Sequence, residues 1–137
     1  MQKAILDTNI IVSALIQKSY PYFILYDLYL ERKFELCVSE ALIVEYYDVL
    51  GRQKFLRFPN FAVNATWLLK DIHDYATLFY PTVEIDVIKD HDDNKLLELA
   101  VESNADFLVT GNTNDFIIPA YHNTKILSPK DFWEYYK

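Results

Sequence analysis

The sequence predicts an α/β fold: a parallel central β-sheet flanked by helices on both faces, as in an α/β/α sandwich. Short apolar runs that suit buried strands alternate with longer segments of helical periodicity. Acidic residues stand where several of these segments begin or end, and the carboxyl ends of parallel strands share one edge of a sheet. With 137 residues, 52% of them hydrophobic, the chain fits a single domain over residues 1–137.

The first half of the chain is expected to start with a short buried strand and to alternate from there. Its predicted elements are a strand at 4–6, a helix to about residue 17, a helix at 21–32, a strand at 34–38 and a helix at 40–50. Thr8 or Asn9 can cap the first helix and Ser39 the third, because their side-chain oxygens accept from the free amides of a first turn. Gly51 suits the end of that third helix.

The second half opens with a basic connector and continues the alternation. Its predicted elements are a connector at 52–60 with a helical turn, a helix at 61–80, a strand at 82–85, a helix after 90–93, strands at 107–110 and 125–127, and a helix from residue 129 onwards. The helix at 61–80 carries apolar residues near a 3.6-residue period. Pro81 is expected to stop it, because proline lacks the amide hydrogen that a helix needs.

Composition argues against a membrane protein and favours a reducing compartment. No apolar stretch approaches the ~20 residues of a membrane span, and the amino terminus has no signal-peptide pattern. The single cysteine, Cys37, falls within the strand predicted at 34–38, which indicates a buried and reduced thiol. We therefore expect a cytoplasmic protein that has no membrane partner.

The net charge of −7 at first argues against a nucleic-acid partner, because phosphates attract cations. Seven of the 20 acidic residues, however, lie in or near one proposed cluster: Asp7, Glu40, Glu45, Asp90, Asp92, Asp93 and Asp115. The other 13 equal the 13 lysines and arginines, so the rest of the molecule is balanced. Divalent cations at the cluster would reverse the local field, and net charge alone does not decide the partner.

Four of these acids carry the functional prediction, because the fold would bring them to one edge of the sheet. Asp7 follows the first strand, Glu45 lies nearly two turns into the helix after the second, Asp93 begins a later helix, and Asp115 follows the strand at 107–110. Clustered carboxylates repel one another unless cations neutralise them, and Mg²⁺ and Mn²⁺ prefer oxygen ligands.

This cluster predicts a divalent-metal site. Asp7 and Asp93 are the first choices as ligands, while Glu45 would complete the shell or orient a water molecule. Asp115 would hold a second ion with help from Asn112. Two ions about 4 Å apart would bind the attacking and leaving oxygens of a phosphodiester during hydrolysis.

Each acid taken alone also has an ordinary explanation. Asp7 and Asp115 could be cap or turn residues, and Glu45 could be a solvated position on a helix. The acidic run at 90–93 could simply favour a helix amino terminus through the helix dipole. His91 beside that run is better explained as a solvated histidine than as a metal ligand. Only the conjunction of the acids favours a metal site.

In these same segments the chain resembles the PIN-domain family, over nearly its whole length. The matching segments, in the family's order, are 6–15, 39–45, 90–100, 105–116 and 126–132. The resemblance implies a Mg²⁺- or Mn²⁺-dependent ribonuclease that acts on RNA. Compact bacterial and archaeal members resemble the toxins of toxin–antitoxin pairs, which implies an antitoxin protein partner and a possible homodimer.

The resemblance also implies roles for individual residues. It carries the acidic positions onto Asp7, Glu45 and Asp93, with Asp115 in the last acidic segment, and its motifs include the supporting residues Asn9, Ser39, Thr110 and Asn112. There are departures from the pattern. Relatives often have Asp where Asn112 stands, which implies a weaker second metal, and His91 stands where Pro is common. Asp92 beside Asp93 leaves a one-residue ambiguity, and the spacing to the following helix favours Asp93.

Aromatic and basic residues raise the question of partners. Tyr22, Tyr26 and Tyr29 share one face of the helix expected at 21–32, where they would form an interface, stack on bases or pack against a neighbouring helix. Arg52, Lys54 and Arg57 in the connector could contact RNA phosphates, receive an acidic antitoxin segment, or belong to a solvated loop.

Two other functions compete with the nuclease. A module that keeps the fold but only binds RNA or protein is suggested by Asn112 and by the acidic balance. A phosphoacceptor domain of the receiver type is suggested by Asp7, Thr110 and Lys125 near strand ends. That domain would also need an acidic pair at the first strand and an Asp that ends a middle strand, and the sequence has neither.

Overall fold

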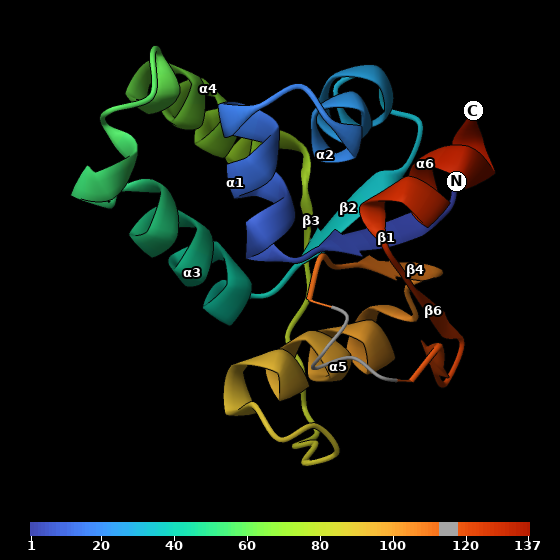
Figure 1. Ribbon diagram of the computed structural model, residues 1–137. Coiled ribbons are helices and arrows are strands. Elements are labelled where there is room, and N and C mark those ends of the chain that lie inside the picture. The colour runs from blue at the N-terminus through green and yellow to red at the C-terminus, as the bar shows by residue number, and fades with distance from the viewer. Residues whose placement is uncertain (113–117) are drawn as a thin grey trace.

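A single mostly parallel sheet organises the protein, as seen in the computed structural model, which describes residues 1–112 and 118–137 (Figure 1). Six strands of the described chain follow the order β3-β2-β1-β4-β6-β5. Their bounds are β1 Lys3–Leu6, β2 Glu35–Val38, β3 Thr77–Leu78, β4 Phe107–Val109, β5 Ala120–Tyr121 and β6 Thr124–Leu127. Every neighbouring pair is parallel except β5 and β6, which are antiparallel.

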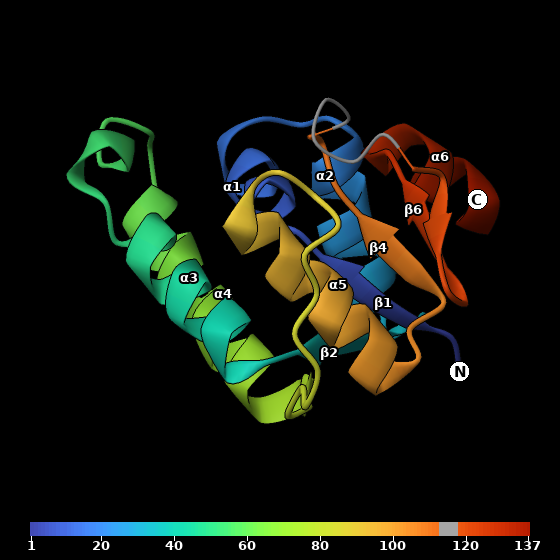
Figure 2. The same cartoon turned by 90° about the horizontal axis from the view of Figure 1, so that it is seen from below.

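Helices cover both faces of this sheet. Their bounds are α1 Thr8–Ile16, α2 Tyr20–Phe23, η1 Ile24–Tyr29, α3 Glu40–Leu50, η2 Gln53–Phe55, α4 Phe61–Tyr75, α5 His91–Ser103 and α6 Pro129–Tyr136. Figures 1 and 2 show α1, α2 and α6 on one face and α5 on the other, while α3 and α4 form a pair at one side. The predicted fold class, a parallel sheet between layers of helices, is confirmed.

The central strands are apolar after their first residues, Lys3 in β1 and Glu35 in β2, because both of their faces are covered. Ala4, Ile5 and Leu6 of β1 are buried, as are Leu108 and Val109 of β4, the strand beside it. Because these strand residues are buried and apolar, functional side chains are expected in the polar segments that follow the strands. No helix in the described part of the chain is long and apolar enough to cross a membrane.

The long helix predicted at 61–80 is wrong at its carboxyl end, since α4 stops at Tyr75. Ala76 is extended, and the amide of Phe79 donates to the carbonyl of Val38 at 2.8 Å. Thr77 and Leu78 therefore add a short strand beside β2, which apolar periodicity cannot distinguish from a helix. The strand predicted at 82–85 is absent; that part of the described chain has no regular structure.

The helix predicted at 21–32 is also changed, because its second part is a π-helix. Backbone amides there donate five residues back, Leu30 to Leu25 at 3.0 Å and Lys33 to Leu28 at 2.9 Å. Of the three possible uses of the tyrosine stripe, the structure favours packing against a neighbouring helix. The ring of Tyr26 lies 6.1 Å from that of Trp67 in α4, and Tyr29 is only 2% exposed.

Helix caps follow the sequence in most places. Ser39 accepts a hydrogen bond from the amide of Leu42 at 3.2 Å, and Gly51 ends α3, both as predicted. At α1, however, neither Thr8 nor Asn9 is the cap: Asp7 holds that position, without a side-chain capping bond. The hydroxyl and amide of Thr8 and Asn9 are used elsewhere, at the edge of the sheet where the candidate site lies.

Candidate functional site

The site is built where β1 and β4 end side by side. The amide of Asp7 donates to the carbonyl of Val109, the last residue of β4, at 2.9 Å, which continues the parallel pairing one residue past the end of β1. The hydroxyl of Thr110 donates to Oδ2 of Asp7 at 2.8 Å. Asp7 is only 7% exposed, so these bonds fix a carboxylate that is largely removed from water.

Asn9 and the segment after β4 extend this arrangement. Nδ2 of Asn9 donates to Oδ2 of Asp7 at 3.4 Å, while its Oδ1 accepts from the amide of Gly111 at 3.3 Å. The amide of Asn112 donates to the hydroxyl of Thr110 at 3.0 Å. The structure thus brings together four residues singled out in the sequence: Asp7, Asn9, Thr110 and Asn112.

Glu45 reaches the same corner through Thr8. The Thr8 hydroxyl donates to Oε2 of Glu45, although the two residues are 37 positions apart. The next residue, Tyr46, is fully buried and its hydroxyl donates to the carbonyl of Leu6 at 2.5 Å. Burial raises the pKa of Tyr46 well above its ordinary value, and the nearby carboxylates of Asp7 and Glu45 raise it further. Helix α3 is therefore tied to the end of β1 at its middle turns.

Sequence reasoning missed the roles of Thr8 and Tyr46. Thr8 was a candidate helix cap, and its bond to Glu45 depends on how α1 and α3 pack. Tyr46 looked like one of many aromatic residues on a helix. The only available signal was position, since each stands next to one of the predicted carboxylates, Asp7 and Glu45.

Asp93 lies in the first turn of α5 and is 9% exposed. The turn is fixed by two of its neighbours. Asp90 caps the helix by accepting from the amide of Asp92 at 2.9 Å. The buried Asn94 accepts from the amide of Ile88 at 2.8 Å and donates to the carbonyl of the same residue at 2.6 Å. The cap role of Asp90 matches the ordinary explanation, whereas burial of Asp93 calls for compensation of its charge.

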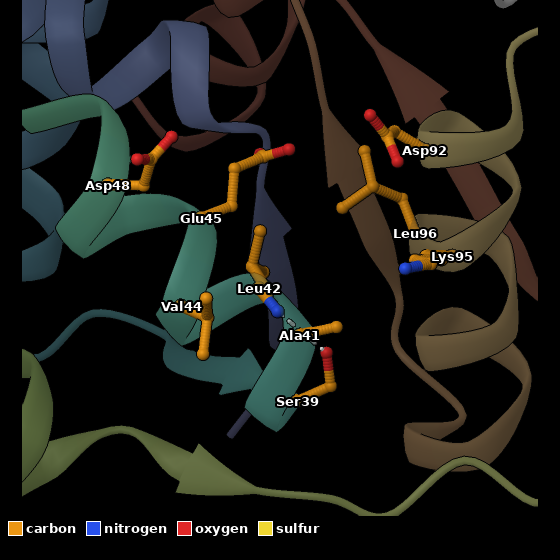
Figure 3. Close-up of a pocket in the computed structure, with 9 residues that line it drawn as sticks. All are labelled: Ser39, Ala41, Leu42, Val44, Glu45, Asp48, Asp92, Lys95 and Leu96. Atoms are coloured by element: carbon orange, nitrogen blue, oxygen red, sulfur yellow. Dashed lines mark hydrogen bonds between the residues drawn. The ribbon is translucent and has the colours of Figure 1, made fainter.

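A groove of about 290 Å³ lies between α3 and α5. Figure 3 shows the side chains that line it. Glu45 from α3 and Asp92 from α5 approach each other across it. The two adjacent acids differ in their surroundings: Asp93 is buried, whereas Asp92 is exposed and lines the groove. Ser39 also lines the groove while it caps α3. The other lining residues are Ala41, Leu42, Val44, Asp48, Lys95 and Leu96.

The donors at this edge suit a hard cation by their chemistry, since carboxylate, hydroxyl and amide oxygens are the ligands that Mg²⁺ and Mn²⁺ prefer. Within residues 1–112 and 118–137, however, no three His, Cys, Asp or Glu side chains form a group that could hold a metal ion. Asp115, the fourth predicted acid, lies outside the described residues.

The basic residues of the connector lie beyond the carboxyl end of α3, past Gly51, rather than in the groove. Arg52 forms an ion pair of 3.1 Å with Asp48. Lys54 and Arg57 are exposed, and each lies over the ring of the phenylalanine that follows it. These contacts are those of a solvated surface, and the proposed RNA or partner contacts of all three stay predictions.

Comparison with known proteins agrees with this architecture. An uncharacterized protein of Methanocaldococcus jannaschii is 25% identical over 140 residues, which cover 96% of this chain and 90% of that protein. The crystal structure of VapBC2 from Rickettsia felis, bound to a DNA fragment from their promoter, has a similar fold, with a TM-score of 0.58. The likeness covers 93% of this chain and 98% of that chain at 18% identity.

The family assignment rests on a match to most of the chain. The family model described as PIN domain matches residues 3–114, which include Asp7, Glu45 and Asp93. The same stretch contains the three strands that are directly followed by a predicted site residue, β1 before Asp7, β2 before Ser39 and β4 before Thr110. Sequence and fold agree, and the chain belongs to the PIN-domain family.

Proposed function

We propose that the protein is an endoribonuclease that hydrolyses RNA phosphodiester bonds with Mg²⁺ or Mn²⁺. The observation that carries this proposal is the buried carboxylate of Asp7, held by Thr110 at the carboxyl edge of the sheet and joined to Glu45 through Thr8. A carboxylate that is buried and oriented by two chain segments suits a binding role better than a helix cap, because it makes no capping bond.

Four carboxylates would hold the metal: Asp7, Asp93, Glu45 and Asp115. Bound there, the ion would lower the pKa of a water molecule and neutralise charge on the phosphate. The chain's own residues do the positioning. Thr110 and Asn9 orient Asp7, and Thr8 restrains Glu45 so that it faces the groove. Two buried apolar residues, Leu42 and Leu96, line the groove beside Glu45.

The same proposal includes protein partners and a cytoplasmic location. The family resemblance implies an antitoxin, and the fold neighbour VapBC2 was crystallised with promoter DNA. An apolar surface suits such a partner: Tyr47 and Leu56 are exposed and line a groove of about 820 Å³ between α3 and α4. Arg52 and Lys70 line the same groove, where Arg52 is paired with Asp48 at 3.1 Å and Lys70 with Asp74 at 2.9 Å. A homodimer would use exposed apolar residues of the same kind.

A cleavage assay with matched variants tests the nuclease. Purified protein is incubated with RNA in Mg²⁺ or Mn²⁺, with an EDTA control. Asp7→Asn and Asp93→Asn are expected to lower the cleavage rate by about a thousand-fold or more. Asp27→Asn, an exposed position on η1, is expected to leave it unchanged. Cleavage that survives EDTA and both site variants would refute the proposal.

A binding module without catalysis is the second candidate, and Asn112 is the observation that favours it. An amide in place of a carboxylate gives the site one negative charge fewer for a cation. Under this alternative, RNA or a protein partner binds equally well to the wild type and to Asp7→Asn, and no metal supports turnover. The same set of variants therefore separates the two functions.

A further inference from the structure

Lys95 lines three adjoining hollows at the edge of the sheet that carries the candidate site. One is the groove between α3 and α5. The second, of about 260 Å³, reaches Phe79, Tyr80 and Pro81. The third, of about 490 Å³, lies between α5 and the segment before it. Among the described residues that line these hollows, Lys95 is the only lysine or arginine.

The ammonium group of Lys95 is not used by the fold. It makes no ion pair with any residue in the described ranges, although Glu98 and Asp92 line the same hollows. Figure 3 shows its nitrogen turned from α5 into the groove. The ammonium group projects from α5 among carboxylates but forms an ion pair with none of those in the described ranges. It can therefore bind an external anion.

An aromatic pair, Phe79 and Tyr80, lines the second of these hollows, whereas Glu45 lines the first. Phe79 and Tyr80 follow the carboxyl end of β3, as Asp7 follows that of β1, so they lie at the same edge of the sheet. The amide of Phe79 is anchored to the carbonyl of Val38 at 2.8 Å, which fixes the backbone beside Tyr80. The side chain of Tyr80 is 63% exposed, far more than a core aromatic residue.

We propose that this edge binds single-stranded RNA, with Lys95 on a backbone phosphate and Tyr80 stacked on a base. The groove next to Glu45 would then hold the strand near the scissile bond. A single cation suits one phosphate, and an exposed ring beside it suits one base of any identity. The inference rests on the proposed nuclease function, because RNA is the ligand that it supplies.

Equilibrium binding of a labelled single-stranded RNA of about 12 nucleotides tests the proposal. All proteins carry Asp7→Asn, so that the RNA stays intact. Lys95→Gln is expected to weaken binding about ten-fold and to reduce the slope of log affinity against log salt by roughly 0.7, the value for one phosphate contact on a single strand. Lys95→Arg restores both quantities. Lys33→Gln, an exposed lysine before β2 at the opposite edge, changes neither.

Tyr80 has its own matched variants. Tyr80→Ala is expected to weaken binding about ten-fold with an unchanged salt slope, because stacking involves no counterion. Tyr80→Phe, which keeps the ring, binds as the parent does.

Three outcomes overturn the inference. The first is that the parent protein does not bind the RNA. The second is that Lys95→Gln changes neither the affinity nor the salt slope. The third is that Lys95→Gln weakens binding with an unchanged salt slope and lowers the Tm, which marks a structural role for Lys95. If the wild type cleaves no RNA but binding still depends on Lys95 as described, the nuclease proposal fails and the binding site stands.

Discussion

The hydroxyl of Thr110 donates a hydrogen bond of 2.8 Å to the carboxylate of Asp7, although 103 positions separate them in the chain. The parallel pairing of β1 with β4 produces this contact, because it places the residues just past both strands next to each other. The same hydroxyl accepts from the amide of Asn112. Thr110 therefore connects a proposed metal ligand to the segment that continues toward Asp115.

Thr110→Val should lower the cleavage rate by about ten-fold, because the buried carboxylate of Asp7 loses a hydrogen bond that contributes about 1.5 kcal/mol. Thr110→Ser keeps the hydroxyl and should retain most activity. The measurement is kcat at saturating Mn²⁺, with circular dichroism as a check on folding. Equal activity of the Val and Ser variants would show that the bond does not orient Asp7.

Thr8 and Glu45 should behave as a coupled pair. Thr8→Val removes the donor and Glu45→Ala removes the acceptor of the same bond, so their effects on cleavage are expected to be less than additive in the double variant. The measurement is a double-mutant cycle on kcat/KM. A coupling free energy indistinguishable from zero would contradict a role for Thr8 in holding Glu45.

Asn112→Asp should strengthen metal binding, because it adds a negative charge next to the segment of Thr110. We expect the Mn²⁺ concentration for half-maximal cleavage to fall several-fold. Asn123→Asp, an exposed position on the turn between β5 and β6, is the control for net charge. An unchanged metal requirement in Asn112→Asp would place that side chain outside the metal site.

The ion pair between Arg32 and Asp71 should stabilise the fold in a pH-dependent way. Arg32 binds both oxygens of Asp71, at 2.7 and 3.0 Å, and stacks 3.8 Å from the ring centre of Tyr75. Burial alone would raise the pKa of Asp71, but the bonds from Arg32 hold it below its ordinary value of 3.8. The contribution is therefore present above about pH 4 and is lost as the pH falls through the lowered pKa.

Urea unfolding measures this effect. Asp71→Asn should lower the free energy of unfolding by about 2 kcal/mol at about pH 7, the usual size for hydrogen bonds to a charged group. The difference from the wild type should shrink as the pH is lowered toward about 3. A difference that is the same at both pH values would contradict the pH dependence.

Cys37 should be inert while the protein is folded. The side chain is fully buried in β2, and burial, followed by the charge of Glu35, raises the pKa of its thiol to about 12. Reaction with a soluble disulfide reagent should be slower than in urea by roughly a thousand-fold or more, since the thiolate is the nucleophile. Rapid modification of the native protein would show that β2 opens readily.

The sequence was sufficient for the elements whose signal is local. The buried runs at β1, β2 and β4 and the cap at Ser39 are confirmed, because hydrophobic runs and cap residues act over a few positions. The chain between Ala76 and Ile88 was not predictable in the same way. The strand β3 in this segment forms because it pairs with the edge of β2. The later part of the segment is held by Asn94, whose side-chain oxygen accepts from the amides of Val87 and Ile88.

For the candidate site, too, local features could be predicted from the sequence and long-range contacts could not. Asp7, Glu45 and Asp93 could be placed at one edge of the sheet from their positions relative to the predicted strands and helices, and the resemblance to the family pointed to the same acids. The partners of these acids could not be read from the chain, because the bond from Thr8 to Glu45 joins two helices. The π-helix also changed the packing of Tyr29, which a regular helix would have presented on the same face as Tyr22.

Anomalous diffraction from a crystal soaked in Mn²⁺ tests the central claim most directly. We expect a peak at about 2.1 Å from a carboxylate oxygen of Asp7, with Asp93 among the ligands and Glu45 coordinated directly or through water. The peak should vanish in Asp7→Asn. Ordered density for these side chains with no manganese beside Asp7, or manganese bound only elsewhere on the surface, would contradict the account.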